Sequence, residues 1–263
     1  MVFMDSRRLT GKFLFAKSLL SRFATCDSVT KVFSRFIVIR SPRHPRVAIA
    51  LPRNSVSPQT APAVFFGFYE AAELRAINHL LPSGLPVVEI GGGVGVVSSH
   101  VIQKLSSGPL RVVEANPRLI NILEYNLASN NVNKIPFEIV HGALDYSGHE
   151  MVGLEISASH LETRVKLQNE FLTGSDFAPA LTLADVVNGW NDYSLIADIE
   201  GAEVEFILGD EPALDRCMWL CLELHRTSFQ GQPVSISELL EGIANKGFEL
   251  TYMDGPVVVA RRK

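Results

Sequence analysis

The stretch Val87–His100, VVEIGGGVGVVSSH, decides which fold this chain can adopt. Val87, Val88 and Ile90 favour a buried strand, because strands covered on both faces carry nearly continuous apolar residues. Glycines at the turn that follows permit positive φ and let a ligand approach the backbone closely. These glycines are Gly91, Gly92, Gly93 and Gly95. The stretch therefore predicts a strand, a ligand-binding turn and a helix.

The acidic residue before the glycines indicates the kind of ligand. The dinucleotide pattern Gly-x-Gly-x-x-Gly fails in every register, because Val94, Val96 or Ser98 occupies a required glycine position. A carboxylate at Glu89 disfavours a pyrophosphate and favours a cationic ligand. S-adenosylmethionine carries a sulfonium and an ammonium and no phosphate. The spacing Glu-x-Gly-x-Gly-x-Gly resembles motif I of the class I methyltransferases, which use this cofactor.

Two further strand ends extend the predicted cofactor site. The segment Leu110–Pro117, LRVVEANP, places Glu114 at the end of a second buried strand, 23 positions after Gly91. In doubly wound folds an acidic residue there accepts hydrogen bonds from ribose hydroxyls. Small residues after a third strand can pack on adenine, and Asp145 or a backbone N–H can meet the polar edge of that base. The predicted cofactor-binding residues are Glu89, Gly91, Gly92, Gly93, Gly95, Glu114, Ala115, Asn116, Gly142, Ala143, Leu144 and Asp198.

Alternation of strands and helices predicts the fold class. Strands are expected near residues 86–90, 110–114, 136–140, 194–199, 218–224, 248–252 and 256–260, and helices near 71–81, 95–105, 117–130, 202–208 and 235–246. This order favours an α/β, doubly wound, mostly parallel seven-stranded Rossmann-like sheet. Asp254-Gly255 indicates a hairpin, which makes the last strand antiparallel. Residues 150–190 are less regular and favour short strands with a helix near 183–188.

Charge and length divide the chain into an N-terminal extension, residues 1–62, and a methyltransferase-like domain, residues 63–263. The first 50 residues carry ten Lys and Arg against two Asp, although the whole chain has a net charge of −4. Residues 1–25 can form a basic amphipathic helix that either packs on the domain or lies on an anionic surface. We expect no nucleic-acid partner, and the oligomeric state stays undetermined.

The cysteine content and the hydropathy of the chain indicate its cellular compartment. The chain has three cysteines, too few for a disulfide framework, and its apolar run FLFAKSLL at residues 13–20 is too short to span a bilayer. These features predict a cytoplasmic protein, with peripheral membrane contact through residues 1–50 left open.

Acidic residues and a histidine end two further strands and form the predicted catalytic site. Asp198 and Glu200 follow one strand, and Glu223 and His225 follow the next. In extended backbone, residues two apart point to the same side, so these four can meet at one rim. His225 is the candidate base, because an unperturbed imidazole titrates near neutral pH. A second mechanism stays open, in which Asp198, Glu200 and Glu223 hold a divalent cation.

The segment LIADIEGAEVEFILGD, followed by a strand that ends in Glu-x-His, resembles the FkbM family of methyltransferases. Tyr69-Glu70, VEANP and TLADVV at 182–187 add to a resemblance that covers about residues 65–260. Ala197 stands where the family often has lysine, and Glu89-Ile90-Gly91-Gly92-Gly93 replaces a common Asp-x-Gly-Ala-Asn.

The resemblance implies S-adenosylmethionine-dependent O-methylation of a hydroxyl on a sugar, a glycan precursor or a related natural product. The acceptor is then a small molecule or a glycan. Two alternatives are a nicotinamide-dependent oxidoreductase and a non-catalytic binding module with a methyltransferase-like fold. The failed dinucleotide registers disfavour the first, and the retained Asp198, Glu200 and His225 disfavour the second.

Overall fold

The computed structural model describes residues 38–51, 59–156, 163–165 and 176–263. The chain divides into two compact units, Met1–Tyr69 and Glu70–Lys263. The helix predicted over residues 1–25 lies outside the described residues. The predicted domain boundary at 62/63 falls inside α3 (Thr60–Phe66), seven residues before the division between the units, and it stays a prediction.

The described residues of the first unit form a short antiparallel ribbon and a helix. Strand β1 (Val38–Arg40) pairs with β2 (Ala48–Ala50), and the pairing places buried Ile39 opposite buried Ile49. Helix α3 ends at Gly67, whose φ of 65° gives the left-handed turn that glycine tolerates best. Residues 38–51 therefore contain a pair of short strands.

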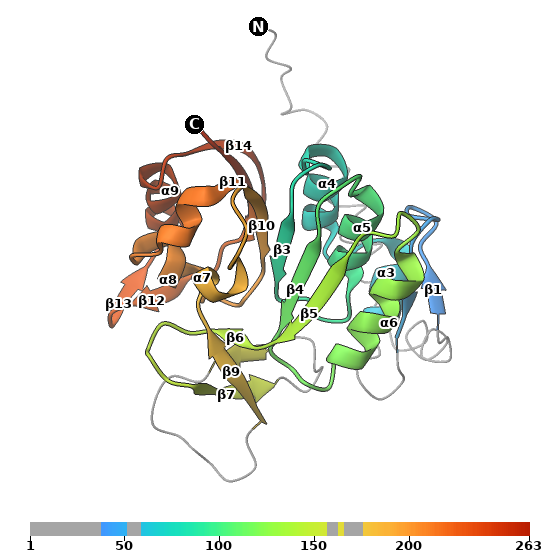
Figure 1. The fold of residues 1–263 in the computed structure, drawn as a ribbon, viewed down its shortest axis with the longest axis horizontal. Helices are drawn as coiled ribbons and strands as arrows, with labels where there is room; N and C mark the ends of the chain where they lie inside the picture. Colours follow the sequence, from blue (N-terminus) through green and yellow to red (C-terminus); the bar gives the residue numbers. More distant parts are fainter. Residues whose placement is uncertain (1–37, 52–58, 157–162, 166–175) are drawn as a thin grey trace, which may run out of the picture. The chain divides into compact units, whose positions relative to one another are not determined.

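The second unit is built on a seven-stranded sheet with the order β14-β15-β11-β10-β3-β4-β5 (Figure 1). All neighbouring strands pair parallel except β15, which is antiparallel to both β11 and β14. This confirms the predicted Rossmann-like fold and the hairpin at Asp254-Gly255. The strands are β3 (Val87–Ile90), β4 (Leu110–Glu114), β5 (Phe137–His141), β10 (Tyr193–Ala197), β11 (Cys217–Glu223), β14 (Phe248–Asp254) and β15 (Val257–Arg262).

Helices cover both faces of this sheet, which explains why its central strands are mostly apolar. Figure 1 shows α4, α5 and α6 on one side and α7, α8 and α9 on the other. Gly242 lets α9 approach α8 closely, because an added Cβ would lie 2.7 Å from Ile207 Cγ2. The helices are α4 (Ala71–Leu80), α5 (Val96–Lys104), α6 (Ile120–Asn130), α7 (Leu183–Val186), α8 (Glu203–Leu208) and α9 (Ile236–Asn245), with the 3₁₀ helix η2 (Pro212–Arg216) before β11.

A smaller sheet follows the carboxyl end of β5 and has the order β6-β9-β7-β8 (Figure 1). It forms its own small core from Ala143, Val152, Leu154 and Ala178. A separate hairpin of β12 (Thr227–Phe229) and β13 (Gln232–Val234) follows β11. The strands of the smaller sheet are β6 (Ala143–Leu144), β7 (Met151–Ile156), β8 (Thr163–Val165) and β9 (Asp176–Leu181).

Among the described residues, no helix combines the length and the hydropathy that crossing a membrane requires.

Candidate active site

The glycine turn between β3 and α5 packs directly against the segment after β10. Gly91 has a φ of 94°, and a Cβ added there would lie 2.1 Å from the carbonyl oxygen of Asp198. Only glycine fits this contact without moving the backbone. Gly93 also has positive φ, 53°, but an added Cβ would meet nothing within 4 Å. The turn is thus fixed on one side and open on the other, as a ligand-binding turn requires.

Glu114 holds this turn in place from the end of β4. Its carboxylate accepts the backbone N–H of Gly93 at 2.7 Å and that of Asn116 at 2.6 Å. Burial raises the pKa of Glu114, and these N–H donors act against that rise. In the structure the Glu114 carboxylate binds the backbone N–H groups of Gly93 and Asn116. Its predicted contact with the ribose stays a prediction.

Glu89 is a buried carboxyl beneath the same turn. Its Oε1 accepts a hydrogen bond from the Ser98 hydroxyl of α5 at 2.8 Å, and its buried Oε2 has no hydrogen-bond partner within residues 38–51, 59–156, 163–165 and 176–263. Burial raises the pKa of Glu89 to about 8, with a smaller contribution from the charge of Glu114. A cation near this carboxyl would favour its ionised form. The unpartnered oxygen and the open side of the turn fit a cofactor that carries positive charge and no phosphate.

The residues predicted to face adenine follow β5. The Gly142 N–H donates to the Glu114 carbonyl at 3.1 Å, and an added Cβ on Gly142 would lie 2.3 Å from Leu181 Cδ1. Ala143 and Leu144 are buried in β6, where they pair with β9. The Ala115 carbonyl oxygen forms a hydrogen bond with His141 Nε2 at 3.0 Å. Their contact with adenine stays a prediction.

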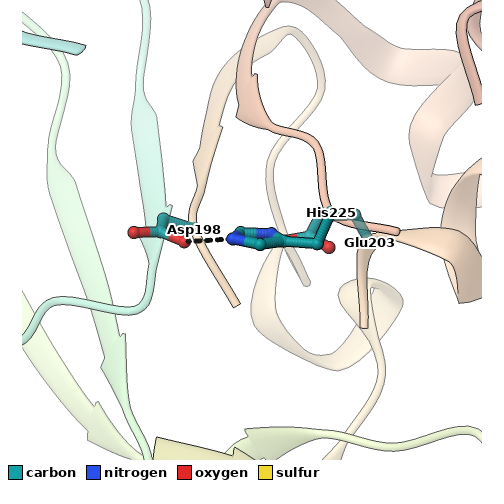
Figure 2. Close-up of side chains that lie close together, drawn as sticks. All are labelled: Asp198, Glu203 and His225. Atoms are coloured by element: carbon teal, nitrogen blue, oxygen red, sulfur yellow. Dashed lines mark ion pairs between the residues drawn. The ribbon is translucent and has the colours of Figure 1, made fainter. Parts of the chain in front are cut away.

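The four predicted catalytic residues meet around the His225 ring at the carboxyl ends of β10 and β11. Figure 2 shows Asp198 and Glu203 beside this ring. The ring nitrogen Nε2 lies 3.8 Å from Asp198 Oδ1 and 3.9 Å from an oxygen of both Glu200 and Glu223. The adjacent parallel strands, with Ala197 opposite Leu222, bring the two segments to the same edge.

The turn after β10 differs from the extended backbone assumed from the sequence. Strand β10 ends at Ala197, Glu200 has a φ of 56°, and Gly201 has a φ of 106°. Positive φ is costly for a residue other than glycine, and such strain is concentrated at functional sites. An added Cβ on Gly201 would lie 3.0 Å from Thr227 Oγ1, which accounts for the glycine in this motif. Asp198 and Glu200 therefore approach the ring through a turn, rather than through strand alternation.

Two further carboxyl groups belong to the same cluster. Glu203, the first residue of α8, has a fully buried side chain; its Oε1 accepts the Ile199 N–H at 2.9 Å and lies 3.4 Å from His225 Nδ1. Glu73 of α4 is 6% exposed and has a carboxylate oxygen within 4.8 Å of oxygens of both Asp198 and Glu223. The cluster thus contains Glu73, Asp198, Glu200, Glu203, Glu223 and His225, and we call it the acidic cluster.

Glu203 and Glu73 are not among the site residues that the sequence predicts. A signal for Glu73 does exist, because it lies on the same face of α4 as the buried Ala76 and Ile77. A carboxyl in an apolar stripe requires a partner.

Crowding shifts the pKa values in the acidic cluster. The contact with Glu203, together with the charges of Asp198 and Glu200, raises the pKa of His225 to about 9, despite partial burial. Burial raises the pKa of Asp198 to about 7, followed by repulsion from Glu223. Burial also raises the pKa of Glu73 to about 8, followed by its contact with the Glu223 carboxylate. In the free protein the imidazole therefore carries a proton at neutral pH and partly neutralises its acidic neighbours.

The sheet order, the glycine turn and the acidic cluster define an α/β enzyme of the class I methyltransferase type, with its ligand at the carboxyl edge. The family model for the methyltransferase FkbM domain matches residues 89–250. The chain therefore belongs to the FkbM family of S-adenosylmethionine-dependent methyltransferases. This confirms the resemblance and decides against the oxidoreductase and the non-catalytic module. S-adenosylmethionine is the cofactor.

Solved structures similar to this chain are also methyltransferases. A ribosomal protein L11 methylase from Lactobacillus delbrueckii subsp. bulgaricus is 13% identical, with 87% of this chain and 100% of that chain covered and a TM-score of 0.46. A precorrin-6y C5,15-methyltransferase from Geobacter metallireducens is 14% identical, with 81% and 94% covered and a TM-score of 0.43. No curated protein sequence matches the chain significantly.

Proposed function

We propose that this enzyme transfers the methyl group to a hydroxyl oxygen of a sugar, a glycan precursor or a related natural product. The observation that carries the proposal is the acidic cluster beside the glycine turn, with His225 Nε2 within 3.9 Å of three carboxylates. A hydroxyl is a weak nucleophile at neutral pH and needs a group that takes its proton. A cluster of carboxylates with an imidazole supplies such a group and accepts hydrogen bonds from hydroxyls.

The glycine turn and its supporting carboxyl groups would hold the cofactor. Gly91 and Gly93 shape the turn, Glu114 fixes the Gly93 N–H, and the Glu89 carboxyl lies beneath. When bound, S-adenosylmethionine supplies an electrophilic methyl group next to a positively charged sulfur. Because the Asp198 carbonyl lies against Gly91, the acidic cluster borders the cofactor turn directly.

We infer that the Asp198–His225 pair accepts the proton of the acceptor hydroxyl. The two side chains are 3.8 Å apart and interact electrostatically, so they titrate as a unit. Glu203 is fully buried and contacts Nδ1, which orients the ring so that Nε2 faces the rim. Glu200 and Glu223 lie on that rim, where they can hold neighbouring hydroxyls of a sugar.

Methyl transfer from isotopically labelled S-adenosylmethionine tests the proposal. The purified chain is incubated with sugars, glycan precursors and polyols, and with matched amine and thiol acceptors, and products are identified by mass spectrometry. We expect a labelled methyl ether on a hydroxylated acceptor. Label on nitrogen, sulfur or carbon instead would contradict O-methyl transfer.

Substitutions of the two proposed proton-accepting residues test their role independently of the identity of the product. Asp198→Asn and His225→Gln should fold normally and lose about 10²–10⁴-fold in turnover, as expected for loss of a proton acceptor. His79→Gln is the matched control, because His79 is an exposed histidine on α4. Full turnover in both site variants would place proton acceptance elsewhere.

A further inference from the structure

Three carboxyl groups of the acidic cluster come from three different elements of the fold. Glu73 comes from α4, Asp198 follows β10, and Glu223 ends β11. Each offers a carboxylate oxygen, and these oxygens lie within 4.8 Å of one another. Like charges at this separation repel, so the arrangement requires either protons or a cation among the oxygens.

Burial makes this requirement stricter than in an exposed acidic patch. Glu73 is more than nine-tenths buried, and its carboxylate reaches those of Asp198 and Glu223. Its Oε1 has no hydrogen-bond partner in the part of the chain that the structure describes. Glu203 is fully buried with a carboxylate oxygen within 4.8 Å of one of Asp198, and its Oε2 has no hydrogen-bond partner among the described residues. A buried ionised carboxylate is unfavourable unless it is paired or coordinates a metal ion.

The positive charge in the acidic cluster is that of the His225 imidazole, which lies to one side of the carboxylates of Glu73, Asp198 and Glu223. Its Nδ1 faces Glu203 and its Nε2 lies 3.8 to 3.9 Å from Asp198 and Glu223, beyond ordinary hydrogen-bond length. One imidazolium does not balance a group of carboxylates that also includes Glu73. A ligand with more than one positive charge would complete the balance.

We propose that Glu73, Asp198 and Glu223 bind a divalent cation, Mg²⁺ or Mn²⁺. Three carboxylate oxygens are the ligand type that these hard cations prefer, and Mg²⁺ keeps several waters in addition. A second set, Asp198 with Glu203 and His225, also lies within 4.8 Å. The all-carboxylate set fits better, because Glu203 Oε1 already accepts the Ile199 N–H at 2.9 Å.

The site has a role that rests on the proposed O-methyl transfer, although ion binding itself does not. A hydroxyl bound to the cation becomes more acidic, because the ion stabilises the alkoxide. Asp198 is then occupied by the ion. The cation would supply the positive charge that the protonated imidazole supplies in the free protein, so His225 could release its own proton to solvent and then accept the proton of the acceptor hydroxyl. The direct contact between the Asp198 carbonyl and Gly91 places this cation at the border of the cofactor turn.

Direct ion binding tests the site without reference to activity. The full chain is treated with chelator, dialysed and titrated with Mn²⁺, and free Mn²⁺ is followed by electron paramagnetic resonance. Competition with Mg²⁺ then shows whether the two ions share the site. We expect saturable binding of about one Mn²⁺ per chain, weakened about tenfold or more by Glu73→Gln, which removes one charged ligand and keeps the side-chain shape.

Glu249→Gln is the control, because Glu249 is exposed on β14. Gln at position 73 cannot ionise in this buried site, so we expect Glu73→Gln to fold at least as well as the native chain without metal, as thermal unfolding will show. Absence of saturable Mn²⁺ binding to the native chain would overturn the proposal. Equal binding by Glu73→Gln and the native chain would also overturn it, as would Zn²⁺-preferring binding that depends on His225 rather than on Glu73.

A chelator assay separates this proposal from the proposed function. Loss of O-methyl transfer in chelator, restored by Mg²⁺ or Mn²⁺, supports both. Bound Mn²⁺ with turnover that chelator does not change supports the ion site and contradicts its role in activating the acceptor. Metal-dependent methylation of nitrogen or carbon supports the ion site and contradicts O-methyl transfer.

Discussion

Glu89→Gln should make the protein more stable, by an amount that grows with pH. Glu89 is 2% exposed, and burial raises its pKa to about 8 from an ordinary value of 4.5. The folded chain therefore holds this proton more tightly than the unfolded chain. Stability from the protonated carboxyl is complete below pH 4.5 and is lost as pH rises toward 8, because the unfolded chain ionises freely in that interval.

The expected magnitude follows from linkage. Each pH unit in the interval changes the free energy of unfolding by about 1.4 kcal/mol for one proton. Between about pH 5 and pH 8 the loss from Glu89 amounts to roughly 3–4 kcal/mol. Glutamine keeps the size of the side chain and an oxygen for the Ser98 hydroxyl, but it cannot ionise. The difference in unfolding free energy between Glu89→Gln and the native chain should therefore increase by this amount.

Urea unfolding at several pH values, followed by tryptophan fluorescence, measures this difference. Glu73 and Asp198 also have raised pKa values and make the native chain lose stability with pH, but their effect cancels in the comparison. Glu249→Gln, at an exposed position, should show a difference that stays constant with pH. A constant difference for Glu89→Gln as well would refute the reasoning and mean that Glu89 is ionised in the folded chain.

Four further changes test the cofactor turn and the N-terminal segment. Glu114→Ala should weaken S-adenosylmethionine binding by about 1–3 kcal/mol in calorimetry, because the Gly93 N–H loses its acceptor, and NAD should not bind comparably. Gly91→Ala should abolish cofactor binding, since its Cβ would meet the Asp198 carbonyl, whereas Gly93→Ala faces open space and should cost only about 1 kcal/mol of stability. Deleting residues 1–25 should leave cofactor binding intact and reduce turnover or liposome association in a salt-sensitive way; an unfolded product would show that the segment is part of the core.

The main sheet was predictable because its central strands are buried on both faces. Val87, Val88 and Ile90 are at most 2% exposed, and parallel strands of this kind appear in the sequence as apolar runs between helical patterns. The smaller sheet gave a weaker signal. Strand β9 mixes buried Ala178 with partly exposed neighbours, and Pro179 breaks the expected pattern for a strand, so its pairing depends on contacts distant in sequence.

The predicted catalytic residues do come together, but the geometry that brings them together was not the predicted one. Strand periodicity predicts Asp198 and Glu200 on the same side of an extended strand. The structure ends β10 at Ala197 and reaches the same rim through a turn with positive φ at Glu200 and Gly201. The Gly201–Thr227 contact that fixes this turn joins segments far apart in the sequence, and strand periodicity carries no information about it.

The carboxyl edge of the sheet holds buried acids on both sides of the glycine turn. Glu89 lies beneath the turn, and Glu73 and Glu203 lie in the acidic cluster beyond it, each with an oxygen that has no hydrogen-bond partner. Folding alone does not favour Glu89 and Glu73 at these positions, because each must keep a proton or carry an unpaired charge in a buried site. A cationic cofactor at Glu89 and a divalent cation at Glu73 would each remove such a cost. Ligands at about 100 times their Kd stabilise a protein by about 2.7 kcal/mol each, so both ligands together should raise the thermal midpoint more than either ligand alone.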